Sequence, residues 1–389
     1  MTVPRILIVA GSDSGGGAGI QADIKTATML GCHAITAITA VTAQNTQGVD
    51  AVHPIPTDMV MAQIDCVVRD IGVDAVKIGM IGSARTALAL ADRLAEMPGL
   101  PVVFDPVMVA TSGATLADDA TIAAFERLMR VATLATPNLP ELAALVAGGE
   151  AAQLVARFGC AVLAKGGHAE GAEVTDRLYR APREGQAPEI AWSDPRIDTP
   201  ATHGTGCTLS TAIACELAKD WSLAEAIARA RRFVRIAMQD AAGLGRGHGP
   251  MAQQAVRLDL NQSRWSPMLN HVTLPASDLA ASEHFYRRLG LRQIVRAEPR
   301  YARFETEGGA TLSLEAEEAL AAPMLFLECG DLDVTVAYLK AQGIAFTQEP
   351  RDESWGWREA RIADPAGNIL CLYQAGEMRR FPPWRLADA

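Results

Sequence analysis

Short apolar runs alternate with amphipathic segments along the chain up to about residue 217. The apolar runs are RILIVA (5–10), AITAITAV (34–41), AVKIGM (75–80), PVVFDPV (101–107), ATLATP (132–137) and AVLAKGG (161–167). Apolar residues at helical spacing lie between several of these runs, as in 20–30 and 121–130. This rhythm predicts an α/β fold with a mostly parallel sheet and helices on both faces. Because parallel strands point the same way, the segments that follow them gather at one edge, where such folds bind ligands.

Polar and glycine residues stand at the predicted carboxyl ends of these strands. In strand order they are GSDSGGGAG (11–19), Gln44, GM (79–80), Asp105, TPNLPE (136–141) and KGGH (165–168). The topology alone therefore predicts a binding site at this edge. The segment 11–19 lacks the final Gly-Lys-Ser/Thr of a P-loop and does not match Gly-x-Gly-x-x-Gly, so we interpret it as substrate-side backbone.

The pattern changes after GHGPM (247–251), and we predict two domains, 1–262 and 263–389. The second domain contains an internal repeat. At one constant spacing, Asp278-Leu279 recurs as Asp331-Leu332, Phe285 as Tyr338, Gly290 as Gly343 and Leu291 as Ile344. At a slightly longer spacing, 302–314 resembles 360–372. The repeat predicts an α+β domain of two βαβββ modules.

Composition and charge narrow the class of ligand. Hydrophobic residues make up 49 % and charged residues 21 % of the chain, as in folded globular proteins. The net charge of −10 argues against binding to nucleic acid or to an anionic membrane, and favours small ligands. The uncharged stretch 26–49 contains six threonines, so we interpret it as a helix end and a buried strand, not as a membrane span. The N-terminal apolar run is too short for a secretion signal, and the seven cysteines form no Cys-x-x-Cys pair, so we expect a cytoplasmic protein with free thiols.

A cysteine stands where two glycines meet an apolar helix, in THGTGCTLS (202–210). Apolar residues at helical spacing over 209–217 predict a helix that begins at about Gly206 or Cys207. The first N–H groups of a helix lack internal partners and carry partial positive charge, so this point favours an anion. We therefore expect a thiol of lowered pKa that accepts a proton beside a transferring phosphoryl group. Alternatively Cys207 is a small packing residue, as we expect of Cys215.

Seven segments together resemble one known family. They are GSDSGGGAGIQADIKT (11–26), VTAQNTQGV (41–49), KIGM (77–80), DPVMVATSG (105–113), TPNLPE (136–141), KGGH (165–168) and HGTGCTLS (203–210). In this order they closely resemble the bacterial hydroxymethylpyrimidine and phosphomethylpyrimidine kinases of thiamin biosynthesis, which are ribokinase-like enzymes. The likeness covers roughly residues 3 to 262. Most of the ribokinase superfamily has Asp at the position of Cys207.

The resemblance implies ATP-dependent phosphorylation of the hydroxymethyl group of 4-amino-5-hydroxymethyl-2-methylpyrimidine, and then of its monophosphate to the diphosphate. It makes Cys207 the general base, and the N–H groups of Gly204, Thr205, Gly206 and Cys207 the donors that hold the charge on the transferring phosphoryl group. It implies that Gln44 binds the aminopyrimidine edge, and that Gly11, Ala18, Asp23, Thr42, Met80 and Val107 line the pocket. It implies that Lys165 neutralises the triphosphate of ATP, while Asp105, Asn138 and Glu141 position Mg²⁺ or its waters.

Several of these residues have a structural alternative. Gln44 alternatively caps a turn, and Lys165 is alternatively a solvated surface charge. Asn138 and Glu141 have the spacing of a helix N-terminus with a capping box, a role that can coexist with metal binding. We expect His203 to be a solvated loop residue.

A second resemblance covers about 268–376. NHVTLPASDLAASEHFYRRLGLR (270–292) and DPAGNILCLYQ (364–374) are similar to the vicinal-oxygen-chelate superfamily of glyoxalases, ring-cleaving dioxygenases and bleomycin-binding proteins. The likeness implies metal-ligand positions at His271, Ser313, Met324 and Cys371. Only His271 is a usual ligand, so we expect no transition metal in this domain. Glu315 is the alternative partner of His271 if the register differs.

The sequence therefore predicts a bifunctional pyrimidine kinase joined to a metal-free module that binds a small molecule or mediates dimerisation, and we expect a homodimer. Trp355 and Trp357 either roof an apolar cup that stacks a planar ring or form an edge-strand packing pair. Two alternatives to the kinase remain. One is a vitamin B6 kinase of the same superfamily, against which Gln44 and Cys207 speak, and the other is an inactive kinase that serves as a ligand sensor.

Overall fold

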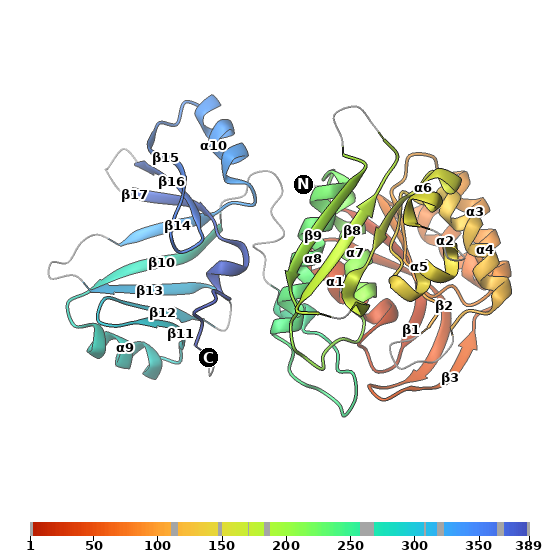
Figure 1. Cartoon of the computed structure of the whole chain (residues 1–389), viewed down its shortest axis with the longest axis horizontal. Coiled ribbons are helices and arrows are strands. Elements are labelled where there is room, and N and C mark those ends of the chain that lie inside the picture. Colours follow the sequence, from red (N-terminus) through yellow and green to blue (C-terminus); the bar gives the residue numbers. More distant parts are fainter. Residues whose placement is uncertain are drawn as a thin grey trace. The chain divides into compact units, whose positions relative to one another are not determined.

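Figure 1 shows the computed structural model of the chain, which describes residues 3–109, 116–146, 150–169, 171–182, 187–256, 268–306, 309–316, 323–363 and 369–386. The chain divides into two compact units, Met1–Val256 and Arg257–Ala389. The predicted domain boundary between residues 262 and 263 lies outside the described residues and stays a prediction. None of the helices in the described ranges has the length and apolar character needed to cross a membrane.

A nine-stranded sheet forms the centre of the described part of the first unit, in the order β3-β2-β1-β4-β5-β6-β7-β8-β9. The strands are β1 (Arg5–Asp13), β2 (His33–Gln44), β3 (Val49–Pro54), β4 (Ala75–Ile78), β5 (Val102–Phe104), β6 (Leu134–Ala135), β7 (Ala161–Ala164), β8 (Glu173–Tyr179) and β9 (Glu189–Pro195). Strands β2, β1, β4, β5, β6 and β7 pair in parallel, whereas β3, β8 and β9 pair antiparallel at the edges. The predicted parallel sheet is confirmed. The strands that the sequence did not predict are the edge strands, whose largely exposed residues form no apolar run.

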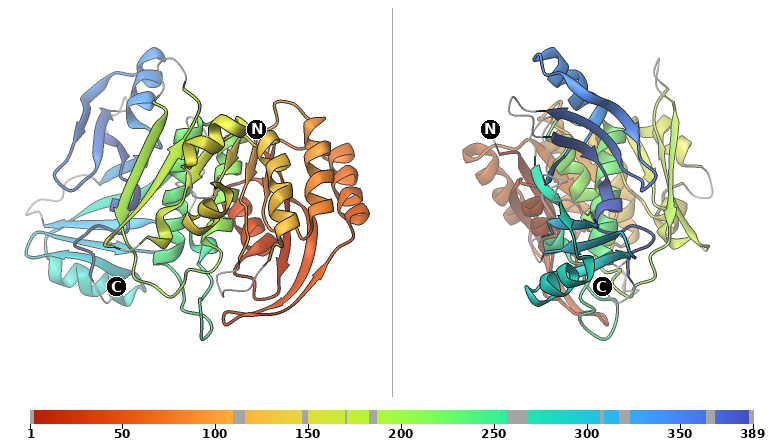
Figure 2. Two further views of the ribbon diagram at one scale, coloured as in Figure 1. Left: turned by 45° about the vertical axis from the view of Figure 1, so that its right-hand side comes forward. Right: turned by 90° about the vertical axis from the view of Figure 1, so that its left-hand side faces the viewer.

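Helices cover both faces of this sheet (Figures 1 and 2). One layer consists of α1 (Gly19–Met29), α7 (Thr205–Leu217) and α8 (Leu223–Gln239). The other consists of α2 (Thr57–Asp70), α3 (Ala84–Ala95), α4 (Asp119–Val131), α5 (Leu139–Val146) and α6 (Ala151–Phe158). Two short 3-10 helices, η1 (Gly166–His168) and η2 (Gln253–Ala255), complete the described elements of the first unit.

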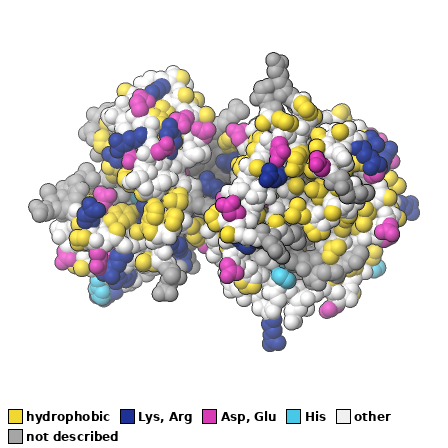
Figure 3. All heavy atoms as spheres, in the orientation of Figure 1, with side chains coloured by type: hydrophobic (Ala, Val, Ile, Leu, Met, Phe, Trp, Pro, Cys, Tyr) yellow, Lys and Arg dark blue, Asp and Glu magenta, His cyan; other side chains and the backbone are white. Residues whose placement is uncertain are grey.

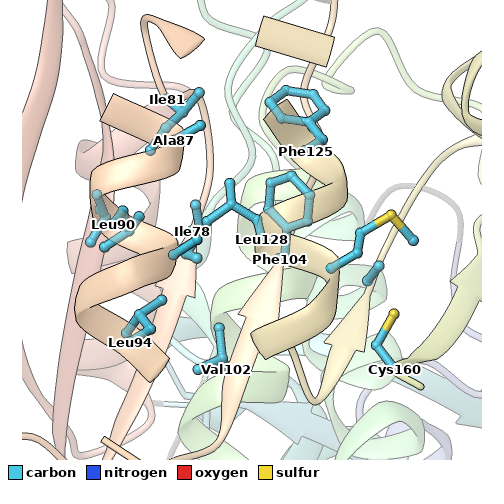
Figure 4. Close-up of a cluster of buried hydrophobic side chains, with 14 of the residues drawn as sticks. Ile78, Ile81, Ala87, Leu90, Leu94, Val102, Phe104, Phe125, Leu128 and Cys160 are labelled. Atoms are coloured by element: carbon cyan, nitrogen blue, oxygen red, sulfur yellow. The ribbon is translucent and has the colours of Figure 1, made fainter. Parts of the chain in front are cut away.

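The core beneath α3 and α4 fixes the central strands (Figure 4). Leu90 of α3 and Leu128 of α4 are fully buried against the sheet. Phe104 of β5 meets Phe125 of α4 edge-to-face, with ring centroids 5.1 Å apart. Each such side chain contributes about 1.5–3 kcal/mol by leaving water. The packing therefore holds the end of β5 rigidly, directly before Asp105.

The second unit contains, in its described residues, an eight-stranded sheet in the order β11-β12-β13-β10-β14-β17-β16-β15. Its elements in chain order are β10 (Met268–Ala276), α9 (Leu279–Arg288), β11 (Arg292–Ala297), β12 (Tyr301–Glu305), β13 (Thr311–Ala316), β14 (Met324–Glu328), α10 (Leu332–Ala341), β15 (Phe346–Asp352), β16 (Arg358–Ala363), β17 (Ile369–Gln374) and η4 (Gly376–Arg379). The predicted pair of βαβββ modules is confirmed. The repeated aspartates Asp278 and Asp331 are both helix N-caps, which accept hydrogen bonds from the backbone of Ala281 and Val334.

Candidate active site

The carboxyl ends of the parallel strands meet, as the topology requires. β1 ends at Asp13 and β2 at Gln44, while Asp105 and Lys165 directly follow β5 and β7. Lys165 Nζ donates to Asp105 Oδ1 at 2.7 Å, across a strand that lies between them in the sheet.

Asp13 organises the glycine-rich loop between β1 and α1. Its Oδ1 accepts a hydrogen bond from Gly15 N at 2.8 Å, and its Oδ2 accepts from Gly17 N at 3.0 Å and Ala18 N at 2.8 Å. Burial alone would raise the pKa of Asp13, but the hydrogen bonds from His203 and from the loop backbone hold it below its ordinary value. The carboxylate is therefore ionised at neutral pH and fixes the loop. Sequence reasoning did not single out Asp13, although an aspartate between a buried strand and several glycines was the available signal.

Two glycines bring this loop into contact with the segment before α7. A Cβ atom on Gly17 would lie 2.5 Å from His203 Cδ2, and one on Gly204 would lie 1.9 Å from the Gly17 carbonyl oxygen. Gly204 also has a φ of 80°, in the left-handed region that favours glycine. Larger residues at either position would separate the two segments.

His203 connects Asp13 with Gln44. His203 Nε2 lies 3.0 Å from Asp13 Oδ2 and 3.2 Å from the Gln44 side-chain amide. Since Asp13 is an ionised acceptor, Nε2 carries a proton and donates it. The structure places the Gln44 amide nitrogen toward this N–H and the amide oxygen toward Thr42 Oγ1, 3.2 Å away. That arrangement sets donor against donor at His203, so the hydrogen bonds require the two amide atoms to be exchanged. Thr42 can accept there because its own hydrogen goes to Ser12 O at 2.9 Å.

This network fixes one of the two orientations of the Gln44 amide. The expectation that His203 is a solvated loop residue is wrong, because the residue is only 6 % exposed. Gln44 itself does not cap a turn with its side chain, which lies between Thr42 and His203.

Helix α7 begins at Thr205 with Gly204 as its N-cap, slightly earlier than predicted. A Cβ atom on Gly206 would lie 3.1 Å from Lys165 Nζ and 3.4 Å from Asp105 Oδ2. The start of α7, where the first N–H groups lack partners within the helix, therefore lies directly beside the ammonium of Lys165, whose side chain is 13 % exposed. The two together form a site for an anion such as a phosphate.

The Cys207 thiol lies at this helix start and is partly exposed as a residue. Burial of the sulfur raises its pKa to about 11, and the nearby carboxylates of Asp23 and Asp105 act in the same direction as burial, against the positive charge of Lys77. The prediction of a lowered pKa is therefore wrong. Desolvation of a thiolate outweighs the helix start and one lysine when two carboxylates share the site. Cys215 is fully buried inside α7, as expected.

Asp23 and Lys77 form an ion pair inside the unit. Lys77 Nζ donates to Asp23 Oδ2 at 2.7 Å, and Thr211 Oγ1 donates to Asp23 Oδ1 at 2.7 Å, with both charged side chains inaccessible to solvent. Burial would lower the pKa of Lys77, but the charges of Asp23, Cys207 and Asp105 raise it, so the lysine is protonated. The assignment of Asp23 to the pocket wall stays a prediction. Lys77 was missed, although a lysine within the apolar run AVKIGM was a signal.

Lys165, Asp105 and Glu141 form the opposite side of the site. Thr136 Oγ1 donates to Asp105 Oδ1 at 3.0 Å beside the Lys165 contact. Burial would lower the pKa of Lys165, but Asp105 and Glu141 raise it above its ordinary value. The alternative of Lys165 as a solvated surface charge is wrong, because its side chain is only 13 % exposed and pairs with Asp105. Burial raises the pKa of Glu141 in spite of Lys165.

Asn138 and Glu141 form the capping box that their spacing suggested. Asn138 N donates to Glu141 Oε2 at 2.8 Å, and Glu141 N donates to Asn138 Oδ1 at 2.9 Å. This structural role leaves their assignment to Mg²⁺ a prediction.

Gly11, Ala18, Met80 and Val107 are the remaining residues assigned to the pocket wall. A Cβ atom on Gly11 would lie 3.0 Å from Met80 Sδ, so these two residues are neighbours. Ala18 is the N-cap of α1, and Val107 is half-buried after β5. Their contact with a substrate stays a prediction.

In the second unit the expected metal-ligand positions share one face of the sheet. His271 pairs with Phe326, which pairs with Cys371, while Ser313 and Met324 both pair with Thr273, two residues after His271. His271 Nδ1 contacts Thr311 Oγ1 at 2.7 Å and Nε2 contacts Thr273 Oγ1 at 3.3 Å. Across the described ranges, no three His, Cys, Asp or Glu side chains are grouped as they would be around a metal ion.

The two tryptophans differ in their surroundings. Trp357 is 2 % exposed and stacks on Tyr373, with ring centroids 4.6 Å apart. Trp355 is 38 % exposed and donates from Nε1 to Glu359 Oε1 at 3.1 Å.

Comparison with solved structures shows the class to which this fold belongs. An ADP complex of Bacillus subtilis pyridoxal kinase has a TM-score of 0.59 and 33 % identity, and the match covers 65 % of this chain and 98 % of that one. Phosphomethylpyrimidine kinase from Clostridium difficile has a TM-score of 0.51 and 33 % identity, over 60 % and 98 % of the two chains. The first unit is a ribokinase-like kinase.

Sequence comparison defines the family. The phosphomethylpyrimidine kinase model matches residues 13–252, and the chain belongs to this family. The model of the glyoxalase/bleomycin resistance protein/dioxygenase superfamily matches residues 268–372. The hydroxymethylpyrimidine/phosphomethylpyrimidine kinase of Rhizobium meliloti is 46 % identical over 258 residues, which are 63 % of this chain and 95 % of that relative.

A second relative matches over only part of its own length. The thiamine biosynthesis bifunctional protein ThiED of Geobacter sulfurreducens is 47 % identical over 256 residues, which are 63 % of this chain. The match spans about half of that relative, 51 % of its length.

Proposed function

We propose that the first unit transfers the γ-phosphoryl group of ATP to 4-amino-5-hydroxymethyl-2-methylpyrimidine, and then a second phosphoryl group to the monophosphate. The observation that carries this proposal is the start of α7, where Gly206 lies beside Lys165 and Asp105 and is followed by Cys207. Relatives with this function by name match over almost their whole length, as the Rhizobium enzyme does.

In the first transfer the substrate hydroxyl gives its proton to the deprotonated Cys207 thiolate, its oxygen bonds to the γ-phosphorus, and ADP leaves as its bond to that phosphorus breaks. The N–H groups of residues 204–207 and the Lys165 ammonium hold the charge of the transferring group. The thiol pKa of about 11 makes the thiolate a strong but scarce base at neutral pH. Lys77, within the same buried cluster, stabilises the thiolate.

The site fits Mg²⁺ only together with phosphates and water. No described cluster holds enough ligand side chains to bind the ion alone. The carboxylates of Asp105 and Glu141 would contact metal-bound waters, the mode that Mg²⁺ favours. When bound, the ion would neutralise the phosphate oxygens that face Lys165.

Turnover with two substrates tests the kinase proposal. Purified protein with ATP and Mg²⁺ should convert the hydroxymethylpyrimidine to its diphosphate, followed by ³¹P NMR, and should act poorly on pyridoxal. The pyridoxal arm is needed because solved pyridoxal kinases have the same fold. Faster turnover of pyridoxal would favour the vitamin B6 kinase instead, and no turnover of either would favour the ligand sensor.

We further propose that domain 263–389 is a metal-free module that binds a small molecule or mediates dimerisation, and that the protein acts in the cytoplasm as a homodimer. Support for the metal-free module comes from its chelate positions, of which only His271 is a usual ligand. Elemental analysis of the purified protein and its mass by light scattering test these two points. A stoichiometric transition metal that disappears in His271→Ala, or a monomeric mass, would contradict them.

A further inference from the structure

The sheet of the second unit curls around a polar cluster. Strands β12 and β16 are five places apart in the sheet order, which would separate them by about 24 Å in a flat sheet at ~4.8 Å per strand. Yet the guanidinium carbon of Arg303 in β12 lies 4.7 Å from the ring centroid of Trp357, which directly precedes β16. The face that carries both residues is therefore concave. We call Arg303, Trp357, His271, Tyr301 and Ser313 the inner cluster.

The inner cluster lies on the face opposite the helices. Phe304 and Leu314 pack toward α9, and Leu372 and Ala360 pack with residues of α10. Because side chains alternate along a strand, the neighbours of these residues, including Arg303, point to the other face. Figure 3 shows this unit in space-filling form in the orientation of Figure 1.

Arg303 is a buried cation without a carboxylate partner. It is 6 % exposed, and its Nε donates to Tyr301 Oη at 2.8 Å and lies 3.3 Å from Ser313 Oγ, while Nη1 donates to the carbonyl oxygen of Arg379 at 3.1 Å. Within the described ranges, no acidic side chain forms an ion pair with it. Burial of a charge that only neutral groups contact is costly, so such residues are rarely retained without a function.

Three acidic residues on the same face form ion pairs with arginines other than Arg303. Glu305 pairs with Arg292, Arg380 and Arg385, Glu328 with Arg379, and Glu359 with Arg361. The positive charge of Arg303 is therefore not balanced by these neighbours.

Trp357 supplies a second unused donor. It is 2 % exposed, and its buried Nε1–H has no hydrogen-bond partner among the residues that the structure describes. A buried donor left unpaired costs free energy comparable to a lost hydrogen bond, and buried indole N–H groups usually have an acceptor. The guanidinium stacked on the same ring places an unbalanced charge and an unused N–H close together.

We propose that the inner cluster binds the oxyanion group, carboxylate or phosphate, of a small aromatic molecule, with Arg303 and the Trp357 N–H as donors. An oxyanion matches the planar fork of arginine and supplies the acceptor that the indole lacks. The rings of Phe326 and Tyr373 pack on Trp357, both within 6.0 Å of it by centroid, so the two donors stand beside aromatic, apolar walls suited to an aromatic ligand. This inference rests on the proposal that the second domain is a binding module, and it is independent of the kinase reaction.

Titration of the full chain with benzoate and with phenyl phosphate, followed by calorimetry, tests the inference. Both are measured in a Lys165→Met background, so that phosphate bound at the first unit does not contribute. We expect saturable binding of at least one probe, weakened roughly tenfold or more in Arg303→Gln and less in Trp357→Phe. The preferred probe distinguishes a carboxylate from a phosphate ligand.

Arg288→Gln is the matched control, since it removes the same charge from the exposed surface of α9. It should leave probe binding unchanged. Arg303→Lys serves if Arg303→Gln does not fold, and it should weaken binding because the fork is lost. No saturable binding of either probe in the millimolar range, or equal binding in the Arg303 and Arg288 variants, would overturn the inference. With Lys165 intact, Arg303→Gln should keep pyrimidine turnover, so failure here leaves the kinase proposal untouched.

Discussion

Replacement of His203 tests whether this residue orients Gln44 for the substrate. His203 donates to the ionised Asp13 at 3.0 Å, and a hydrogen bond to a charged group contributes about 1.5–3 kcal/mol. In His203→Leu we expect the free energy of unfolding to fall by about 2 kcal/mol for this reason. Release of the Gln44 amide removes its fixed orientation, because the Thr42 hydroxyl can then turn from Ser12 O to donate to the amide oxygen, or stay there and accept from the amide nitrogen. The loss of one neutral hydrogen bond, worth about 1 kcal/mol, should then lower the selectivity for the amino substrate roughly fivefold to tenfold.

The assay compares kcat/KM for the 4-amino substrate and for its 4-oxo analogue, which presents an acceptor where the substrate has a donor. His203→Leu should lower the ratio of the two values by this factor, mainly through KM of the amino substrate. His203→Gln should restore most of it, because a glutamine amide nitrogen can occupy nearly the same position as Nε2. If His203→Leu lowers both values equally, or if His203→Gln rescues stability without selectivity, the orientation argument is refuted and His203 is structural only.

Three further predictions address the rest of the site. Cys207→Ala should lower turnover of the hydroxymethyl substrate roughly 10²-fold or more, but turnover of the monophosphate far less, because an ionised phosphate has no proton to lose; equal losses in both half-reactions would remove the general-base role. For the first transfer, kcat/KM should rise with pH toward the thiol pKa of about 11, since the base is the deprotonated form, and a flat profile between neutrality and pH 9 would argue against it. Lys77→Met should destabilise the fold by about 3–5 kcal/mol in chemical denaturation, and the double variant Lys77→Met/Asp23→Leu should recover much of this; additive losses would show that the ion pair is not the cause.

The parallel strands and the positions of their following residues could be predicted because buried strands are continuous apolar runs. The edge strands could not, since their residues are exposed and carry no such signal. Gly204, Lys165 and Asp105 were identified from their places after strands or before a helix. His203 and Asp13 required coordinates, because their contact depends on how two distant loops pack.

The pKa of the Cys207 thiol shows a second limit of prediction from sequence. Sequence identifies the helix start that lowers a pKa, but not the density of atoms around the sulfur or the two carboxylates nearby. Both depend on tertiary packing, and here they cause the pKa of the Cys207 thiol to rise instead of fall. In the second unit the repeat predicted the modules, whereas the contact of Arg303 with Trp357 follows from curvature that no local pattern encodes.

The contact between His203 and Asp13 joins residues 190 positions apart. Contacts of such long range form late, after the intervening strands and helices have closed the loop that separates them. No fragment that lacks either end of the first unit can assemble the site, so catalytic activity should recover together with the last phase of refolding and should be absent from truncated translation products.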